Sequence, residues 1–339
     1  MDIGQLRRSR FLCYYSVFVN FLGLCIHFFS IYSTYEYNHI HDIPSNFIPL
    51  FSFINSYQFL GLFFIYVDLV QFHQIEIVKL YREVQKILKY FANCNYKKLE
   101  KLYLWRDVSI AILNAITMVI WDGTVHFKFF RVHKLWYSVI GNAAYIFGIC
   151  MLWNIRRCFC YVLSWLEDLE HRCLEYKELR RLQRIHQQLI NATKTFSSIY
   201  SHIIFFFLMR TSYFCMISLY FTIRIYYSNP RMHVGLKYQL LTPLLCINGM
   251  ILLFTLGSAT GRMEKFSKET KDILRRSCTQ HELLERSNSL LGLHLSLERT
   301  DVRLYGQVTI NRRLCFTFLS QILLYVICMI QEDFNIIWH

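Results

Sequence analysis

The chain is poor in proline and glycine, with 4 Pro and 12 Gly among 339 residues. So few residues that interrupt regular structure exclude a collagen-like chain and disfavour a disordered or loop-rich scaffold. Charged residues are also scarce, at 18% of the sequence. Soluble globular proteins carry about 25%. The composition therefore argues against a soluble fold.

Sequence motifs of catalysis are missing as well. The chain has no Gly-rich phosphate loop, no nucleophile elbow and no regularly spaced Cys/His cluster. The run His281-Glu-Leu-Leu-Glu285 has Glu where a zinc-protease helix needs its second His. The pair His39 and His41 is more typical of a surface than of a metal site. We therefore predict no enzyme activity, no metal and no cofactor.

What the chain has instead is 54% hydrophobic residues, arranged in long blocks. A helix needs roughly 20 apolar residues to cross the hydrocarbon core of a bilayer. Blocks of about this length without Asp, Glu, Lys or Arg lie at 11–32, 47–67, 135–155, 238–261 and 314–331. Two more, 108–127 and 202–223, contain one charge each, Asp122 and Arg210. The sequence thus predicts an all-α, polytopic membrane protein with seven transmembrane helices.

The positive charges predict how these helices are oriented. Of the 37 Lys and Arg residues, 30 lie in segments on the same side as the amino terminus, 6 lie on the opposite side, and Arg210 lies within a span. Cytoplasmic loops of membrane proteins are enriched in Lys and Arg. The amino terminus is therefore predicted in the cytoplasm and, because the number of spans is odd, the carboxyl terminus outside. This asymmetry accounts for the net charge of +14 without a nucleic-acid partner.

The long loops fall on the predicted cytoplasmic side. Four regions follow: 1–258, a six-helix transmembrane ligand-binding region with long cytoplasmic helical loops (71–107 and 156–201); 259–313, cytoplasmic anchor helices; 314–331, the last transmembrane helix; and 332–339, a short extracellular tail. Residues 164–201 place apolar side chains at helical spacing among charges, which predicts an amphipathic continuation of the fourth or fifth span. Such helices either pack together in an assembly domain or lie on the inner leaflet.

Polar side chains inside the predicted spans indicate a candidate pocket for a small molecule. Such a pocket needs mostly apolar and aromatic walls with a few orienting polar groups. The candidates are Asn55, Tyr57, Gln58, Trp121, Asp122, Asn142, Tyr145, Tyr220 and Asn248. For any single amide, hydrogen bonding between neighbouring helices is the alternative and the more common role. Arg210 could pair with Asp68 or extend toward the inner headgroups.

The most specific pattern lies in the last 35 residues. Gly306 and Asn311 precede the last predicted span, and this span ends with Tyr325, five hydrophobic residues and Gln331. The pattern resembles the signature of the insect gustatory receptor family, which is a Thr-Tyr pair, five hydrophobic residues and Gln-Phe, preceded by a Gly and an Asn-Arg-like start. Here Leu324 occupies the Thr position of this signature, and Glu332 occupies its Phe position. With seven spans and long cytoplasmic loops, the resemblance extends over the whole chain.

The resemblance implies a ligand-gated, non-selective cation channel that detects small-molecule tastants and mediates acceptance or avoidance behaviour. It implies a homo- or heterotetramer with other gustatory receptor subunits, in the plasma membrane of gustatory receptor neurons. The carboxyl-terminal half of the last helix would line the central pore. Each subunit would hold an outward-opening ligand pocket, and a cytoplasmic anchor would make most subunit contacts.

The residues of the last helix fit a pore. Leu324, Ile327 and Gln331 share one helical face, because three and four residues separate them. An apolar ring can close a narrow pore by dewetting, and an amide ring can line it without trapping a cation. Ordinary helix packing is the alternative for this face. The predicted pore or gate residues are Leu324, Tyr325, Ile327 and Gln331, and Glu332 and Asp333 form a predicted outer ring that would concentrate cations.

Other seven-span and transport proteins fit less well. An insect odorant-type receptor channel subunit is the closest alternative in fold. A G-protein-coupled receptor needs the opposite orientation and signature segments that the chain lacks. A small-molecule transporter is expected to have paired repeats with interrupted helices, and Pro243 has no counterpart in another span.

Overall fold

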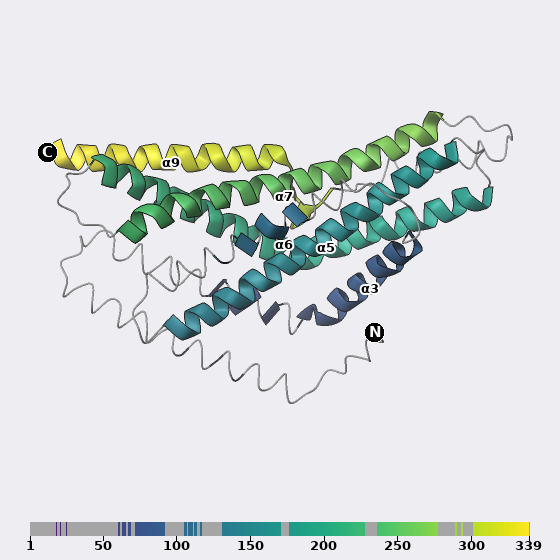
Figure 1. Cartoon of the computed structure of the whole chain (residues 1–339), viewed down its shortest axis with the longest axis horizontal. Coiled ribbons are helices and arrows are strands. Elements are labelled where there is room, and N and C mark those ends of the chain that lie inside the picture. Colours follow the sequence, from purple (N-terminus) through teal and green to yellow (C-terminus); the bar gives the residue numbers. More distant parts are fainter. Residues whose placement is uncertain are drawn as a thin grey trace. The chain divides into compact units, whose positions relative to one another are not determined.

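The computed structural model of the chain describes residues 72–91, 131–170, 176–227, 236–276 and 301–338, together with single positions elsewhere. Its elements are α3 (Gln74–Tyr90), α5 (Arg131–Glu170), α6 (Tyr176–Tyr227), α7 (Leu236–Arg276), β1 (Arg303–Leu304), β2 (Val308–Thr309) and α9 (Arg312–Trp338), as labelled in Figure 1. The predicted spans at 11–32, 47–67 and 108–127 lie largely outside the described residues.

The chain divides into two compact units, each considered by itself. The first consists of Met1–Gln74 and Met118–Ala143. Within it, Nε2 of His73 lies 3.5 Å from Oδ1 of Asp68. The second consists of Ile75–Thr117 and Ala144–His339, so it contains all of α6, α7, the hairpin and α9.

The later predicted spans are confirmed as helices. Residues 135–155 lie in α5, 202–223 in α6, 238–261 in α7 and 314–331 in α9. Among the described residues, Ala143–Asp168 and Arg312–Gln331 are long and apolar enough to cross a membrane. The 52 residues of α6 make it about 78 Å long, more than twice the thickness of a hydrocarbon core. The predicted amphipathic continuation is therefore confirmed as helix in both α5 and α6.

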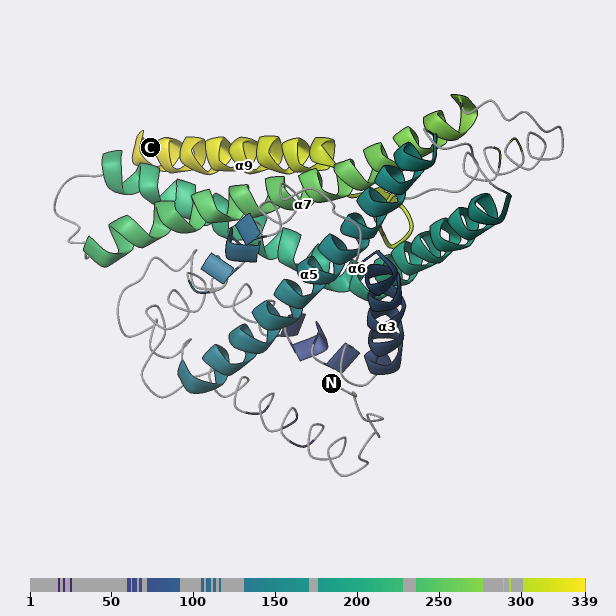
Figure 2. The same cartoon turned by 45° about the vertical axis from the view of Figure 1, so that its right-hand side comes forward.

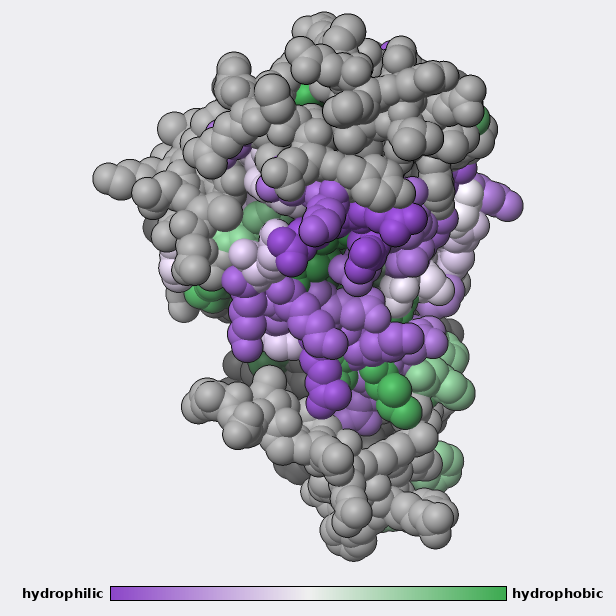
Figure 3. Space-filling model, turned by 90° about the vertical axis from the view of Figure 1, so that its right-hand side faces the viewer, coloured by the Kyte–Doolittle hydropathy of each residue, from purple (hydrophilic) through white to green (hydrophobic). Residues whose placement is uncertain are grey.

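Successive long helices run in opposite directions. Figures 1 and 2 show the end of α5, the start of α6 and the end of α7 together at one end of these helices. Viewed from that end, hydrophilic residues gather in a broad patch (Figure 3). Helix α9 begins beside the middle of α6 and α7 and runs toward their other end (Figure 1). The polar ends of α5, α6 and α7 thus extend beyond the start of α9, the helix predicted to line a pore.

One face of α9 is buried. Ile322 and Val326 pack with Cys215 of α6 in an apolar cluster. The partly buried side chains around this cluster are Met216, Leu219, Ile223, Met250, Met329 and Ile330. They come from α6, α7 and α9, so the last helix is held against both of its neighbours.

A small hairpin departs from the all-α prediction, although the mostly helical class is confirmed. Strands β1 and β2 pair antiparallel, with Arg303 opposite Thr309. Tyr305 and Gly306 have φ of 50° and 72°, and the N–H of Gln307 donates to the carbonyl of Leu304 at 3.0 Å. Two consecutive positive φ values are typical of the type I′ turns that join twisted strands. With two residues per strand, the pairing is too short to leave an alternating pattern in the sequence.

Candidate functional site

Asn311 defines where α9 begins. Its Oδ1 accepts a hydrogen bond from the N–H of Leu314 at 2.9 Å, and its carbonyl accepts one from the N–H of Cys315 at 3.3 Å. This is the geometry of a helix N-cap, in which a short polar side chain satisfies an N–H that has no partner within the helix. The residue singled out from the sequence motif therefore has a definite structural role.

Two serines of α6 hold the hairpin that precedes α9. The Oγ of Ser201 accepts a hydrogen bond from the N–H of Tyr305 at 3.3 Å and lies 3.1 Å from the carbonyl oxygen of Arg303. Its single hydroxyl hydrogen is shared between that carbonyl and the carbonyl of Ser197. The Oγ of Ser197 accepts from the N–H of Arg303 at 3.4 Å. The backbone leading into the last helix is thus fastened to α6.

Aromatic contacts hold the turn of the hairpin. The ring of Tyr305 lies 4.9 Å from the ring of His202 and 5.7 Å from the ring of Phe205, measured between centroids. A positive φ costs a residue with a side chain about 1–2 kcal/mol. Gly306 meets the same requirement without this cost, because it has no Cβ. The packing of the Tyr305 ring helps to offset the strain in its backbone.

Asp301 braces the two strands. Its Oδ2 accepts hydrogen bonds from Nε of Arg303 at 2.8 Å and from Oγ1 of Thr309 at 3.2 Å. Burial by itself raises the pKa of Asp301, but these hydrogen bonds and the charge of Arg303 outweigh it. The pKa of Asp301 therefore lies below its ordinary value, and the carboxylate is ionised at neutral pH.

The start of α9 lies very close to α7. A Cβ built on Gly257 would lie 2.6 Å from Sγ of Cys315 and 3.0 Å from the carbonyl oxygen of Asn311. The guanidinium of Arg312 donates to Oγ of Ser258 at 3.3 Å. Small residues at a helix contact allow the backbones to approach closely. The start of α9 is therefore in direct contact with α7.

The predicted pore face is exposed within the chain. Leu324 is 56% exposed and Ile327 is 53% exposed, and Gln331 is also exposed. Tyr325 is 57% exposed but stands about 100° around the helix from Leu324. The backbone of Glu332 and Asp333 continues α9, and their side chains lie outside the described residues. Packing within this subunit therefore does not cover the Leu324, Ile327 and Gln331 face.

The same face continues toward the start of α9 with Ser320 and Thr317, which are not part of the signature in the last helix. Both are exposed, and their hydroxyls donate to backbone carbonyls of the preceding turn, Ser320 at 2.9 Å and Thr317 at 3.0 Å. Their spacing in the sequence could have placed them on this face, because alternating steps of four and three residues lead from Gln331 to Thr317. The face that we call the α9 stripe consists of Thr317, Ser320, Leu324, Ile327 and Gln331.

Two of the predicted pocket residues are packed in the helical core. Tyr145 is buried, and its ring stacks on Phe207 with centroids 4.3 Å apart. The cavity beside Tyr145 measures about 10 Å³, room for a single water molecule. Tyr220 is buried as well. Outside the described residues lie Asn55, Tyr57, Gln58, Trp121 and Asp122, as do the side chains of Asn142 on α5 and Asn248 on α7.

Arg210 is covered by protein. It is 2% exposed, and its guanidinium carbon lies 5.9 Å from the centroid of Phe207. The structure therefore contradicts an extended side chain that reaches the headgroups. Burial of a charged group within a helix bundle is costly and is associated with functional sites in membrane proteins.

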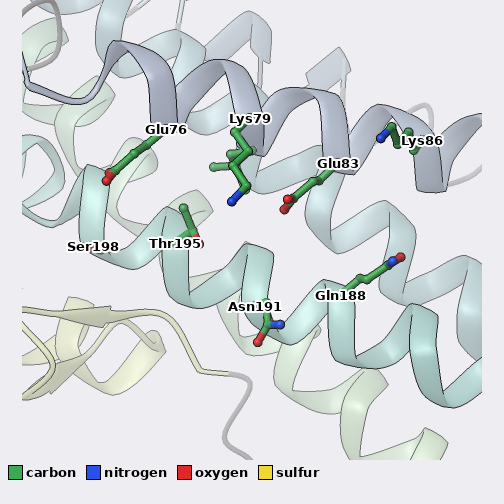
Figure 4. A pocket seen from close by; sticks show the side chains of 9 residues that line it. Glu76, Lys79, Glu83, Lys86, Gln188, Asn191, Thr195 and Ser198 are labelled. Atoms are coloured by element: carbon green, nitrogen blue, oxygen red, sulfur yellow. The ribbon is translucent and has the colours of Figure 1, made fainter.

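A large polar groove runs between α3 and α6. It measures about 550 Å³, and Figure 4 shows Lys79 and Glu83 projecting from α3 toward α6. The other polar side chains that line it are Glu76, Lys86, Gln188, Asn191, Thr195 and Ser198. Charges of both signs alternate along α3, as on a solvated helix face. Among the residues that the structure describes, no group of His, Cys, Asp or Glu could hold a metal ion.

The fold matches that of two solved insect receptor structures. Two solved structures of the olfactory receptor OR5 from Machilis hrabei, one of them in complex with eugenol, each align with a TM-score of 0.65 at 12% identity. The alignments cover 96% and 98% of this chain, and 90% and 92% of those chains.

The sequence identifies the family. The sequence profile described as "7tm Chemosensory receptor" matches residues 2–336, and the chain belongs to this family. A Drosophila melanogaster protein named "Putative gustatory receptor 85a" is 29% identical over 190 residues, which is 54% of this chain and 48% of that protein. The match thus spans about half the length of that relative. The family consists of chemosensory membrane receptors and not of enzymes.

Proposed function

We propose that this chain is a gustatory receptor subunit that acts as a ligand-gated, non-selective cation channel. It detects small-molecule tastants in the plasma membrane of gustatory receptor neurons and mediates acceptance or avoidance. Membership of the chemosensory receptor family and the similarity to a gustatory receptor support this function. The α9 stripe is the structural observation that carries the proposal.

The α9 stripe has the properties expected of a pore wall. It is uncovered within the subunit, it follows one helix over 15 residues, and it changes along its length from hydroxyls to aliphatic side chains and then an amide. A ring of Leu324 and Ile327 from four subunits would close the pore by dewetting, while Thr317 and Ser320 would line a wetter section. Glu332 and Asp333 would concentrate cations at the outer mouth.

The proposed topology has seven spans, a cytoplasmic amino terminus and an extracellular carboxyl terminus. The excess of Lys and Arg on one side of the predicted spans supports this orientation. The gathering of hydrophilic residues at one end of α5, α6 and α7 supports it as well. Four subunits, identical or mixed with other gustatory receptor subunits, would surround the pore, and the polar helix ends and the hairpin would form the cytoplasmic anchor.

Ligand binding would open the pore by a shift in population. A tastant must bind the open arrangement more tightly than the closed one. The candidate pocket includes Asn55, Tyr57, Gln58, Trp121, Asp122, Asn142, Tyr145, Tyr220 and Asn248. Movement of α7 or α6 on ligand binding would reach α9 through the close contact at Gly257 and through the hairpin held by Ser201.

A cation-influx screen tests this function. The chain would be expressed alone and with candidate partner subunits, and then exposed to sugars, bitter compounds and other small molecules. We expect at least one compound to evoke an inward cation current that persists when G-protein signalling is blocked. A current that depends on G proteins, or saturable uptake of the compound without current, would contradict the channel proposal.

An odorant-type channel subunit is the second candidate, because the fold also matches an olfactory receptor that was solved in complex with eugenol. The two candidates differ in their requirement for a co-receptor. Currents that appear only with an odorant co-receptor, in response to volatile compounds, would favour the odorant function.

A further inference from the structure

Helix α9 is covered by the rest of the chain along one face only. Within Arg312–Gln331 the most apolar stretch is 17% buried by the chain, whereas the corresponding stretch within Ala143–Asp168 of α5 is 67% buried. The buried face of α9 contains Cys315, Ile322 and Val326. In a membrane, the remaining surface of α9 is covered by lipid, by water in a pore or by another chain.

The α9 stripe lies nearly opposite this buried face. An α-helix turns by about 100° per residue, so Leu324 lies about 160° around α9 from the buried Ile322. The stripe also carries two hydroxyls and the amide of Gln331. An amide is costly to place in hydrocarbon without a hydrogen-bond partner. The polar content of the stripe therefore favours a pore over lipid on this side of the helix.

Two flanks of different composition lie between the stripe and the buried face. Phe316 and Leu323 lie about 80° and 100° to one side of Leu324. They are 60% and 52% exposed. Tyr325 and Gln321 lie about 100° and 60° to the other side, and both are exposed. One flank is thus apolar, and the other carries a phenol and an amide.

Helices arranged around a central pore contact one another through such flanks. In a closed ring of identical subunits the contact is heterologous, so one flank of each helix meets the opposite flank of the next helix. Rotation about an axis along the membrane normal leaves the height of each residue unchanged. Leu323 and Tyr325 differ by only about 3 Å along the axis of α9. Residues of opposite flanks at this level therefore meet across the contact.

We propose that the two flanks of α9 form the contact between neighbouring copies of this chain, with Leu323 of one copy against Tyr325 of the next. The proposal rests on the proposed function, because it takes the α9 stripe to face a central pore. The pore wall is incomplete without the neighbouring copy. Tyr325 then seals the boundary between two subunits instead of lining the pore. A phenol suits this place, because its ring packs on apolar side chains while its hydroxyl reaches a wetter region.

Cysteine cross-linking tests the contact on the full chain in cell membranes. All variants carry Cys328→Ser, because Cys328 is exposed on α9. On oxidation, Leu323→Cys combined with Tyr325→Cys should lose most of its monomer band to dimer, trimer and tetramer, since each copy is linked to two neighbours. Leu323→Cys combined with Gln321→Cys is a second pair at the same level and should behave alike. Reduction should return the monomer.

Two controls make the test specific. Each single cysteine variant should stay monomeric, because a heterologous contact does not bring a residue against its own copy. Phe316→Cys combined with Tyr325→Cys uses the same two flanks at levels about 13 Å apart, which exceeds the reach of a disulfide. This pair should therefore stay monomeric as well.

The outcomes separate the occupants of the flanks. Lipid on the flanks would leave both same-level pairs monomeric, and this result would overturn the proposal. Links in the single variants, or equal links in the Phe316→Cys pair, would overturn it too. The assay needs no current, so its failure is distinct from failure of the channel function. A ligand-evoked current without cross-links would refute this contact and leave the channel in place.

Discussion

The hydroxyl oxygen of Ser201 lies 3.3 Å from the backbone nitrogen of Tyr305, 104 residues further along the chain. This hydrogen bond fastens the strained turn of the hairpin to the middle of α6. The hairpin leads through Asn311 into the helix that we propose lines the pore. The bond is therefore a direct connection between the helix bundle and α9.

Ser201→Ala removes this connection. The N–H of Tyr305 loses its acceptor, which should cost about 1–3 kcal/mol of stability. We expect a lower melting temperature for the purified protein and a shifted ligand concentration for half-maximal current. Gln188→Ala, also on α6 and exposed, is the matched control and should leave both quantities near the wild-type values. Equal melting temperatures for the two variants would refute the role of this bond.

Gly257→Ala tests the close contact between α7 and α9. The new methyl group would lie 3.0 Å from the carbonyl oxygen of Asn311, which is backbone and cannot rotate away. We expect a loss of about 1–3 kcal/mol from overpacking, measured as a lower melting temperature. Gly261→Ala, four residues later, meets nothing within 4 Å and should be neutral or stabilising. If both variants melt alike, the two helices do not pack at this position.

Gln331→Ala tests the α9 stripe as a pore wall. Removal of an amide ring should change basal current or ion permeability, while the ligand concentration for half-maximal response should change less. The matched control is Gln321→Ala, also exposed on α9 but about 80° around the helix. Patch-clamp recording in expressing cells measures both quantities. Unchanged currents for Gln331→Ala, or equal effects of the two variants, would argue against a pore at this face.

Glu332→Gln combined with Asp333→Asn tests the outer ring of acids. The double variant should conduct less cation current, and the deficit should be larger at low salt because the screening length grows from about 10 Å at 0.1 M to 30 Å at 0.01 M. The ratio of variant to wild-type conductance at the two salt concentrations measures this effect. A ratio that does not depend on salt would show that these side chains lie away from the ion path.

Asp301→Asn tests whether the carboxylate of Asp301 stabilises the hairpin, through the pH dependence of the melting temperature. Because the folded state holds the pKa of Asp301 below the ordinary value of 3.8, the ionised carboxylate stabilises the fold at neutral pH. This contribution is lost as the pH falls from about 3.8 through the lower folded pKa. The wild type should therefore melt higher than the variant at pH 7, and the difference should shrink below pH 4. A difference that is constant with pH would rule out the carboxylate as its source.

Several local features were predictable because local residues decide them. Apolar blocks with at most one charge each predicted the helices α5, α6, α7 and α9, since a chain in lipid must satisfy its own backbone hydrogen bonds. Asn311 could be recognised as the start of α9, because the cap involves the next few residues only. The hairpin could not be predicted in the same way, because its stability depends on serines about 100 residues away in the chain.

The sequence by itself determined the membrane class, the helical content and the spacing of the stripe on α9, because composition and period are properties of the chain alone. Only the tertiary structure decided which face of α9 is covered, since burial of Ile322 and Val326 depends on Cys215 of α6. It also decided that Tyr145 and Arg210 are buried. These contacts are between residues far apart in the sequence, and only the packing of the helices brings them together.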